Sequence, residues 1–191
     1  GYQALASITT GYNNAGFGYQ ALASITTGFK TTAVGYQALR NNTTGEDNVA
    51  MGHQALATVT TADQNVAIGR GTLFNNTAAN QTAVGHSAMY ENTTGTGNTA
   101  FGYNALYNNT TAAYNTAVGH QALHDANRTA DINAYNTAVG YLAGNTGTND
   151  VTTGDKNVLV GASTAASGAA ASNQIVIGYG ASGHGDNIAV I

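Results

Sequence analysis

The stretch GYQALASITTG at residues 1–11 returns letter for letter at residues 18–28. The glycine that opens this stretch recurs along the chain as an anchor, at Gly1, Gly18, Gly35, Gly52, Gly69, Gly85, Gly102, Gly119, Gly140, Gly161 and Gly178. Most anchors are 17 residues apart, but the spacing is 16 after Gly69 and 21 after both Gly119 and Gly140. A fixed period of this length indicates small units that stack on one another. We therefore expect a single repeat array over residues 1–191, with regular coils at 1–123, longer coils with inserted loops at 124–160 and terminal coils at 161–191.

The residues before each anchor predict a short β-strand. The positions one and three residues before the glycine hold β-branched or large apolar side chains, and this period of two places both on one face of a strand. The position directly before the anchor holds Val34, Met51, Ile68, Val84, Phe101, Val118, Val139, Val160 and Ile177. Helices of ordinary length are disfavoured, because Gly and Thr are too frequent in every unit.

The residues after each anchor predict the rest of a coil. Asn-Asn-Thr-Thr-Gly, as at residues 41–45, has the composition of a turn. If each strand pairs in parallel with the next at about 4.8 Å, identical residues stack into ladders. The Asn four residues before most anchors would then bond from coil to coil and fix the register. The fold class expected is all-β, a parallel β-solenoid of about eleven 17-residue coils that forms a rod of roughly 50 Å.

Two further columns predict that several chains associate. A leucine stands four residues after many anchors, at Leu39, Leu56, Leu106 and Leu123. A narrow coil has room for only a few side chains, so we expect these leucines to form an exposed stripe, and large apolar patches mark interfaces. An alanine between the two apolar strand positions, such as Ala83 or Ala100, would let another backbone approach. The alternative is a monomer that buries both columns within its own coil.

Composition excludes several classes of protein. With only five Lys and Arg residues and a net charge of -4, the chain has no basic patch for a run of phosphates, so we expect no nucleic-acid binding. No apolar stretch approaches the ~18 residues of a membrane span, so we expect no membrane insertion. The absence of Cys excludes disulfides and thiolate metal sites.

Three segments carry a resemblance to a known family: NTAFGYNAL at residues 98–106, NTAVGHQAL at 115–123 and NTAVGYLA at 136–143. They resemble the left-handed parallel β-roll repeats in the heads of trimeric autotransporter adhesins. The longer form that continues into NNTTG is similar to repeats in phage tail fibres and bacterial surface fibres. The resemblance implies a left-handed β-roll in an intertwined or laterally packed homotrimer, located outside the cell on a cell surface or virion. Many such proteins end in a self-cleaving chaperone domain, and we expect residues 173–191 to be a last coil followed by the start of another strand.

Candidate chemistry is sparse along the chain. His53, His86 and His120 share the position after the anchor. A metal site on a common axis is one interpretation, but Tyr occupies this position in other coils, and an amphipathic ring with a wet polar tip explains both residue types. The acidic residues lie mostly in turns, where Asp is favoured, and an ion bound in the turn at 150–155 is a minor alternative. We therefore expect no enzyme, no cofactor and no metal site.

The two 21-residue units carry the candidate binding residues. Each inserts about four residues, around 125–135 and 144–155, and insertions in repeat arrays map to loops that often bind partners. The candidates are His124, Asp125, Arg128, Asp131, Asn149, Asp150, Asp155 and Lys156. The alternative is that these loops only cap a turn or widen the rod.

The function expected from all these features is that of a structural and adhesive segment of an extracellular trimeric fibre, in a phage tail fibre or a bacterial surface adhesin, which holds or forms a receptor-binding surface. Its partners would be further copies of itself and a cell-surface glycan or another fibre protein. The alternative is an ice-binding solenoid or a passive spacer. Thr pairs such as Thr43-Thr44 and Thr93-Thr94 recur, but adjacent residues on extended backbone face opposite ways. Each coil would then present one outward Thr, and the array breaks at Ala78 and beyond Ala112.

Overall fold

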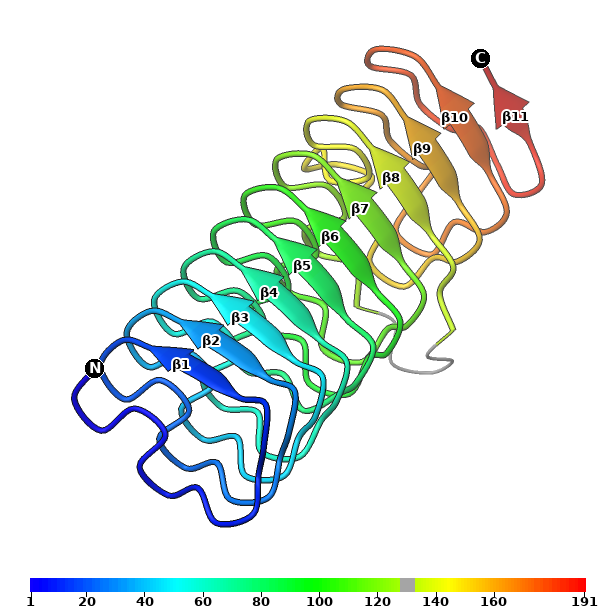
Figure 1. Cartoon of the computed structure of the whole chain (residues 1–191). Helices are drawn as coiled ribbons and strands as arrows, with labels where there is room; N and C mark the ends of the chain where they lie inside the picture. The colour runs from blue at the N-terminus through cyan, green and yellow to red at the C-terminus, as the bar shows by residue number, and fades with distance from the viewer. Residues whose placement is uncertain (128–132) are drawn as a thin grey trace.

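The computed structural model describes residues 1–127 and 133–191, and this part of the chain is all β, with no helix. The strands are β1 (Ala15–Phe17), β2 (Thr32–Val34), β3 (Val49–Met51), β4 (Val66–Ile68), β5 (Thr82–Val84), β6 (Thr99–Phe101), β7 (Thr116–Val118), β8 (Thr137–Val139), β9 (Val158–Val160), β10 (Ile175–Ile177) and β11 (Ala189–Val190). They form one 11-stranded sheet in chain order. The fold is a parallel β-solenoid of about ten turns, with the two termini at opposite ends of the rod (Figure 1).

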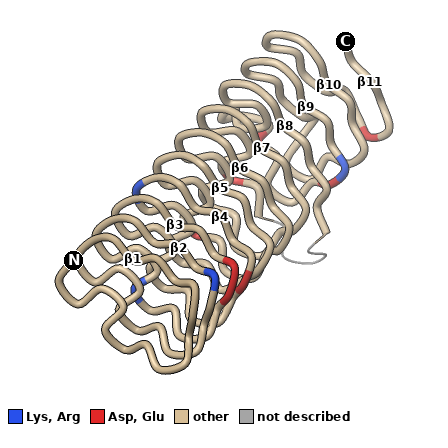
Figure 2. The backbone as a smooth tube through the Cα atoms, in the orientation of Figure 1, with Lys and Arg blue, Asp and Glu red and all other residues tan. Residues whose placement is uncertain are grey.

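The predicted strands and their parallel pairing are confirmed. Val34 pairs with Met51, and Met51 pairs with Ile68. The same register continues through the 16-residue spacing, where Ile68 pairs with Val84, and through a 21-residue spacing, where Val118 pairs with Val139. Changes in coil length are therefore absorbed by the connections and leave the ladder of strands intact. None of the eleven described strands contains a charged residue, and the charged residues of the described chain lie in the connections (Figure 2).

The interior of the solenoid is lined by the middle residue of each strand. Ala33, Ala50, Ala83 and Ala100 have no exposed surface, whereas the residues on either side of them point outward. The alanine column was expected to mark a close approach by another chain. The close approach is instead made by the opposite wall of the same coil, since these alanines and the buried leucines belong to one hydrophobic core.

The expectation of an exposed leucine stripe is wrong. Leu39, Leu56, Leu106 and Leu123 are all 0% exposed and fill the coil interior. The small alanine in the middle of strands β2 to β8 leaves the space that the leucine occupies, so a narrow coil buries more than the sequence pattern suggested. The leucine column is therefore a ladder inside one chain and offers no apolar surface to a partner.

One coil shows the same packing rule with the residue sizes exchanged. Gly144 stands at the leucine position of its coil, and Leu159 stands at the alanine position of β9. A Cβ on Gly144 would lie 2.9 Å from Leu159 Cδ1 and 2.8 Å from Leu123 Cδ2. The larger strand residue thus occupies the space that the missing leucine vacates, which keeps the interior close-packed.

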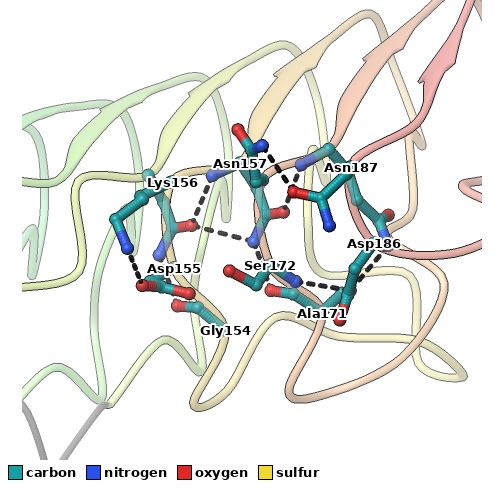
Figure 3. Close-up of polar contacts among 11 residues, drawn as sticks. Gly154, Asp155, Lys156, Asn157, Ala171, Ser172, Asp186 and Asn187 are labelled. Atoms are coloured by element: carbon teal, nitrogen blue, oxygen red, sulfur yellow. Dashed lines mark hydrogen bonds and ion pairs between the residues drawn. The ribbon is translucent and has the colours of Figure 1, made fainter.

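A ladder of buried amides runs the length of the rod next to the strands. The side-chain oxygen of Asn98 accepts a hydrogen bond from the main-chain N–H of Asn115 at 2.9 Å, and Asn98 Nδ2 donates to the carbonyl of Ala112 at 2.9 Å. Near the C-terminal end, Asn157 Nδ2 donates to the carbonyl of Ala171 at 2.7 Å (Figure 3). The predicted asparagine ladder is present, but most of its bonds join side chains to main chain, so it fixes the backbone register directly.

The 16-residue spacing breaks this pattern at one point. The carbonyl that corresponds to Ala112 is that of Ala78, which accepts from Asn76 Nδ2 at 2.7 Å. Asn65 Nδ2 is buried without a partner in this part of the structure, although Asn65 Oδ1 still accepts from the N–H of Gln81 at 3.0 Å.

We predict that Asn98→Ala destabilises the chain by about 1 kcal/mol more than Asn65→Ala. Both variants delete the same buried side chain, but Asn98→Ala removes two hydrogen bonds to main-chain groups and Asn65→Ala removes one, at roughly 0.5–1.5 kcal/mol for each bond. The Ala112 carbonyl keeps the bond that it accepts from Asn109 Nδ2 at 2.9 Å, so the difference between the variants is that of one bond. Urea unfolding of the two variants, followed by circular dichroism, measures the difference. Equal losses would show that the bond from Nδ2 to the main chain contributes nothing to stability.

The bend after most strands uses left-handed backbone at residues other than glycine. In the second coil Gln37 and Leu39 have φ angles of 55° and 50°. Such angles cost roughly 1–2 kcal/mol for an L-residue. They are held by two main-chain hydrogen bonds, one to the preceding coil and one to the following coil. The N–H of Gln37 donates to the carbonyl of Tyr19 at 2.8 Å, and the N–H of Leu39 donates to that of Ala55 at 3.0 Å.

Candidate functional surfaces

No pocket is present in the described ranges 1–127 and 133–191, so the candidate sites are surfaces. The same residues contain no group of three or more His, Cys, Asp or Glu side chains arranged to hold a metal ion. They also contain no helix long and apolar enough to cross a membrane.

The largest candidate surface is the outer side of the sheet, which we call the outward face. It consists of the first and third residues of the strands, such as Thr82 and Val84 in β5 or Thr99 and Phe101 in β6. Eight of its apolar side chains are between 37% and 64% exposed: Phe17, Met51, Ile68, Phe101, Val118, Val139, Ile175 and Ile177. It is uncharged and runs over the whole sheet (Figures 1 and 2).

Beside the outward face, the residue after each anchor forms a ladder of stacked rings. Tyr19 and Tyr36 lie with ring centroids 5.2 Å apart and planes 8° from parallel. His53 continues this stack at 4.9 Å from Tyr36. Arg70 interrupts the rings and places its Nη1 3.2 Å from Nε2 of His86. His and Tyr thus serve the same stacking role, which is the simpler of the two interpretations drawn from their shared column.

A second ring ladder leads into the longer coils. Tyr90 and Tyr107 stack at 5.4 Å, and Tyr107 and His124 stack at 5.3 Å. Burial raises the pKa of Tyr107 above its ordinary value of about 10, and the negative charge of Glu91 acts in the same direction. This ladder reaches the predicted loop residue His124, whose ring is thereby packed against the regular part of the rod.

The inserted loops bring three of the candidate residues together. His124 Nδ1 lies 2.8 Å from Oδ1 of Asp125, which also accepts from Asn108 Nδ2 at 2.6 Å. The side-chain amide of Asn145 lies 3.2 Å from a carboxylate oxygen of Asp125 and 3.2 Å from one of Asp150, and we orient it with its nitrogen toward both because carboxylate oxygens only accept. The two loops therefore meet at a polar cluster, defined here as His124, Asp125, Asn145 and Asp150.

Two of the remaining candidates lie at the asparagine ladder instead. Asp155 and Lys156 pair with each other, with Lys156 Nζ 2.9 Å from Asp155 Oδ2 (Figure 3). The carboxyl of Asp155 is almost fully buried beside the asparagine ladder, which makes it part of the scaffold. Asn149 is half-buried next to Asp150. Arg128 and Asp131 lie outside the described residues.

The threonine pairs divide their roles between scaffold and surface. The hydroxyl of the first Thr in a pair donates to a carbonyl of the next coil, as Thr43 Oγ1 does to Thr60 at 3.0 Å and Thr93 Oγ1 does to Thr110 at 2.9 Å. The second Thr, such as Thr44 or Thr94, is exposed. In these two coils one Thr points outward, as the extended backbone predicts, whereas Thr60 and Thr61 are both exposed.

The outward face was not identified from the sequence as a candidate surface. Its apolar period-two pattern was visible, but Val84 and Phe101 look like core residues until the burial of their neighbours Ala83 and Ala100 is known. Asn145 also escaped notice, because a lone Asn in a turn carries no signal of the carboxylates it contacts.

Compared with family models, curated proteins and solved structures, the chain matches none of them.

Proposed function

We propose that the chain is a structural and adhesive segment of an extracellular fibre in which three copies associate through the outward face. The observation that carries the proposal is the uncharged outward face, on which eight large apolar side chains are 37% to 64% exposed beside threonines such as Thr82 and Thr99. Monomeric soluble proteins rarely expose apolar patches of more than a few hundred Å². The number three, the left-handed sense of the coil and the location on a cell surface or virion follow from the resemblance of the repeats to trimeric fibre proteins.

The size of the outward face suits association. Eleven strands at about 4.8 Å give a length of about 50 Å, and three residues of strand give a width of about 10 Å, so the face covers on the order of 500 Å². Two such faces together would bury about 1,000 Å², the lower limit for specific interfaces. The absence of charge from the strands also fits, because the cores of interfaces are depleted of charged residues.

In this proposal the rod transmits load and the inserted loops meet the partner. Stacked strands joined by main-chain and asparagine bonds resist extension, and three copies of one weak site give avidity. The polar cluster at His124, Asp125, Asn145 and Asp150 offers carboxylate and amide groups that suit sugar hydroxyls or a polar protein surface. The proposed partner is a cell-surface glycan or another fibre protein.

Light scattering coupled to size exclusion tests the association. We expect a mass three times the 19.3 kDa of the chain. The double variant Val84→Lys with Val118→Lys should fall to the mass of one chain with an unchanged circular dichroism spectrum, because it places charges in the middle of the outward face. The matched control, Thr61→Lys with Thr94→Lys, adds the same charges at exposed threonines elsewhere and should keep the trimer mass.

A wild-type monomer would overturn the proposal, and a Val84→Lys, Val118→Lys variant that stays trimeric would move the interface to another surface. The second candidate is ice binding, favoured by the regular rank of exposed threonines such as Thr44 and Thr94. A monomer that shows thermal hysteresis would support ice binding, and a monomer without it would leave the passive spacer.

A further inference from the structure

Tyrosine rings from adjacent coils are stacked at the surface in matched pairs. Tyr19 and Tyr36 lie 5.2 Å apart at 8° from parallel, and Tyr114 and Tyr135 have the same distance and angle. All four side chains are between 42% and 49% exposed, so a solvent-borne reagent reaches them. Tyr103 is equally exposed, at 46%, but its stacking partners are His86 and His120.

The composition directs one-electron oxidation to these rings. The chain contains 11 Tyr but no Cys and no Trp, the other side chains that lose a single electron readily. Of its two Met residues, Met89 is wholly buried, and methionine is oxidised to the sulfoxide by oxygen transfer. An unpaired electron formed on this chain should therefore settle on a tyrosine side chain.

We propose that the stacked tyrosines are a modification site, at which a peroxide-driven one-electron oxidant joins adjacent coils by dityrosine cross-links. Each phenol loses one electron and one proton to give a phenoxyl radical. The two radicals form a carbon–carbon bond between ring positions next to the oxygens, and the ring hydrogens then move to the oxygens and restore both phenols. The pair loses two hydrogen atoms, which reduce one hydrogen peroxide to two waters.

The stacking decides which pairs react. Neighbouring rungs hold equivalent ring carbons opposite each other at about 5 Å, and the exposed rings have room to turn toward one another. Tyrosines two coils apart, such as Tyr2 and Tyr36, are separated by the ring of Tyr19. The product is a covalent link between adjacent coils of one chain, and it does not depend on association into a fibre.

The test treats the purified whole chain with a haem peroxidase and hydrogen peroxide, and then digests the unfolded product with trypsin. Cleavage after Lys30 and Arg40 places Tyr19 and Tyr36 on separate peptides, and cleavage after Arg128 separates Tyr114 from Tyr135. We expect two linked products, residues 1–30 with 31–40 and residues 71–128 with 129–156, each lighter by two hydrogen atoms than the sum of its peptides.

Two variants and one internal comparison complete the design. Tyr19→Phe should abolish the link between 1–30 and 31–40, whereas the matched control Tyr103→Phe should leave both links at their wild-type yield. Tyr179 is the most exposed tyrosine, at 89%, and stacks on no ring in the described structure. Links formed mainly through the Tyr179 peptide, mainly between different molecules, or not at all would overturn the proposal.

Discussion

Replacing Gly102 with alanine is expected to destabilise the solenoid by at least about 3 kcal/mol, through strain and overpacking together. Gly102 has a φ angle of 139°, in the region that L side chains rarely adopt. A Cβ at this position would lie 2.3 Å from the carbonyl oxygen of Gly119 and 2.6 Å from its carbonyl carbon. Both are main-chain atoms of the next coil, so the clash is relieved only if two coils move apart and lose bonds of the ladder.

The matched control is Gly147→Ala in the second inserted loop. Gly147 also has a positive φ, of 87°, but nothing lies within 4 Å of the position of its Cβ. This variant should lower the free energy of unfolding by only about 1 kcal/mol, because alanine disfavours a positive φ angle and nothing else changes. Urea unfolding followed by circular dichroism compares the two. If they lose equal stability, the approach between anchor glycines does not limit the stacking of coils.

The second large effect is expected for Leu106→Ala, at about 2–5 kcal/mol, because it leaves a cavity in a core that cannot collapse easily. Leu106 is fully buried, and its coil is held at a fixed spacing by hydrogen bonds to the coils on both sides, such as that from its own N–H to Ala122 at 3.1 Å. The exposed Thr94 gives the control, since Thr94→Ala should change stability by less than about 0.5 kcal/mol.

The Leu106→Ala variant also distinguishes a leucine column buried within one chain from a leucine column at an interface between chains. A leucine column that served as an interface between chains would make Leu106→Ala lower the mass of the assembly without lowering the stability of the single chain. Because Leu106 is buried within its own coil, we expect the variant to lower the stability of the single chain. In a repeat protein each unit is stabilised mainly by its neighbours, so the loss at Leu106 should spread to the adjacent coils and broaden the unfolding transition.

The two inserted loops contain residues that come together and residues that do not. The loops of the 21-residue units were identified from their length alone, and the structure joins His124 and Asp125 to Asp150 through Asn145. Asp155 and Lys156 belong to the same insertions but lie at the asparagine ladder. The longer spacing between anchors shows where residues are inserted. Which of the inserted residues contact one another depends on contacts between neighbouring coils, which the spacing does not show.

The repeat in the sequence determined the period, the parallel strands, their register and the asparagine ladder. The reason is that a coil which repeats in sequence stacks identical residues at the strand spacing. The tertiary structure alone decided which face of each strand is inside, because a period of two groups Val84 with Thr82 but does not say where the core lies. The tertiary structure also decided the positive φ angles of Gln37 and Leu39. Gln and Leu do not favour such angles, so the sequence gives no sign of them, and hydrogen bonds to the coils on both sides hold them in place.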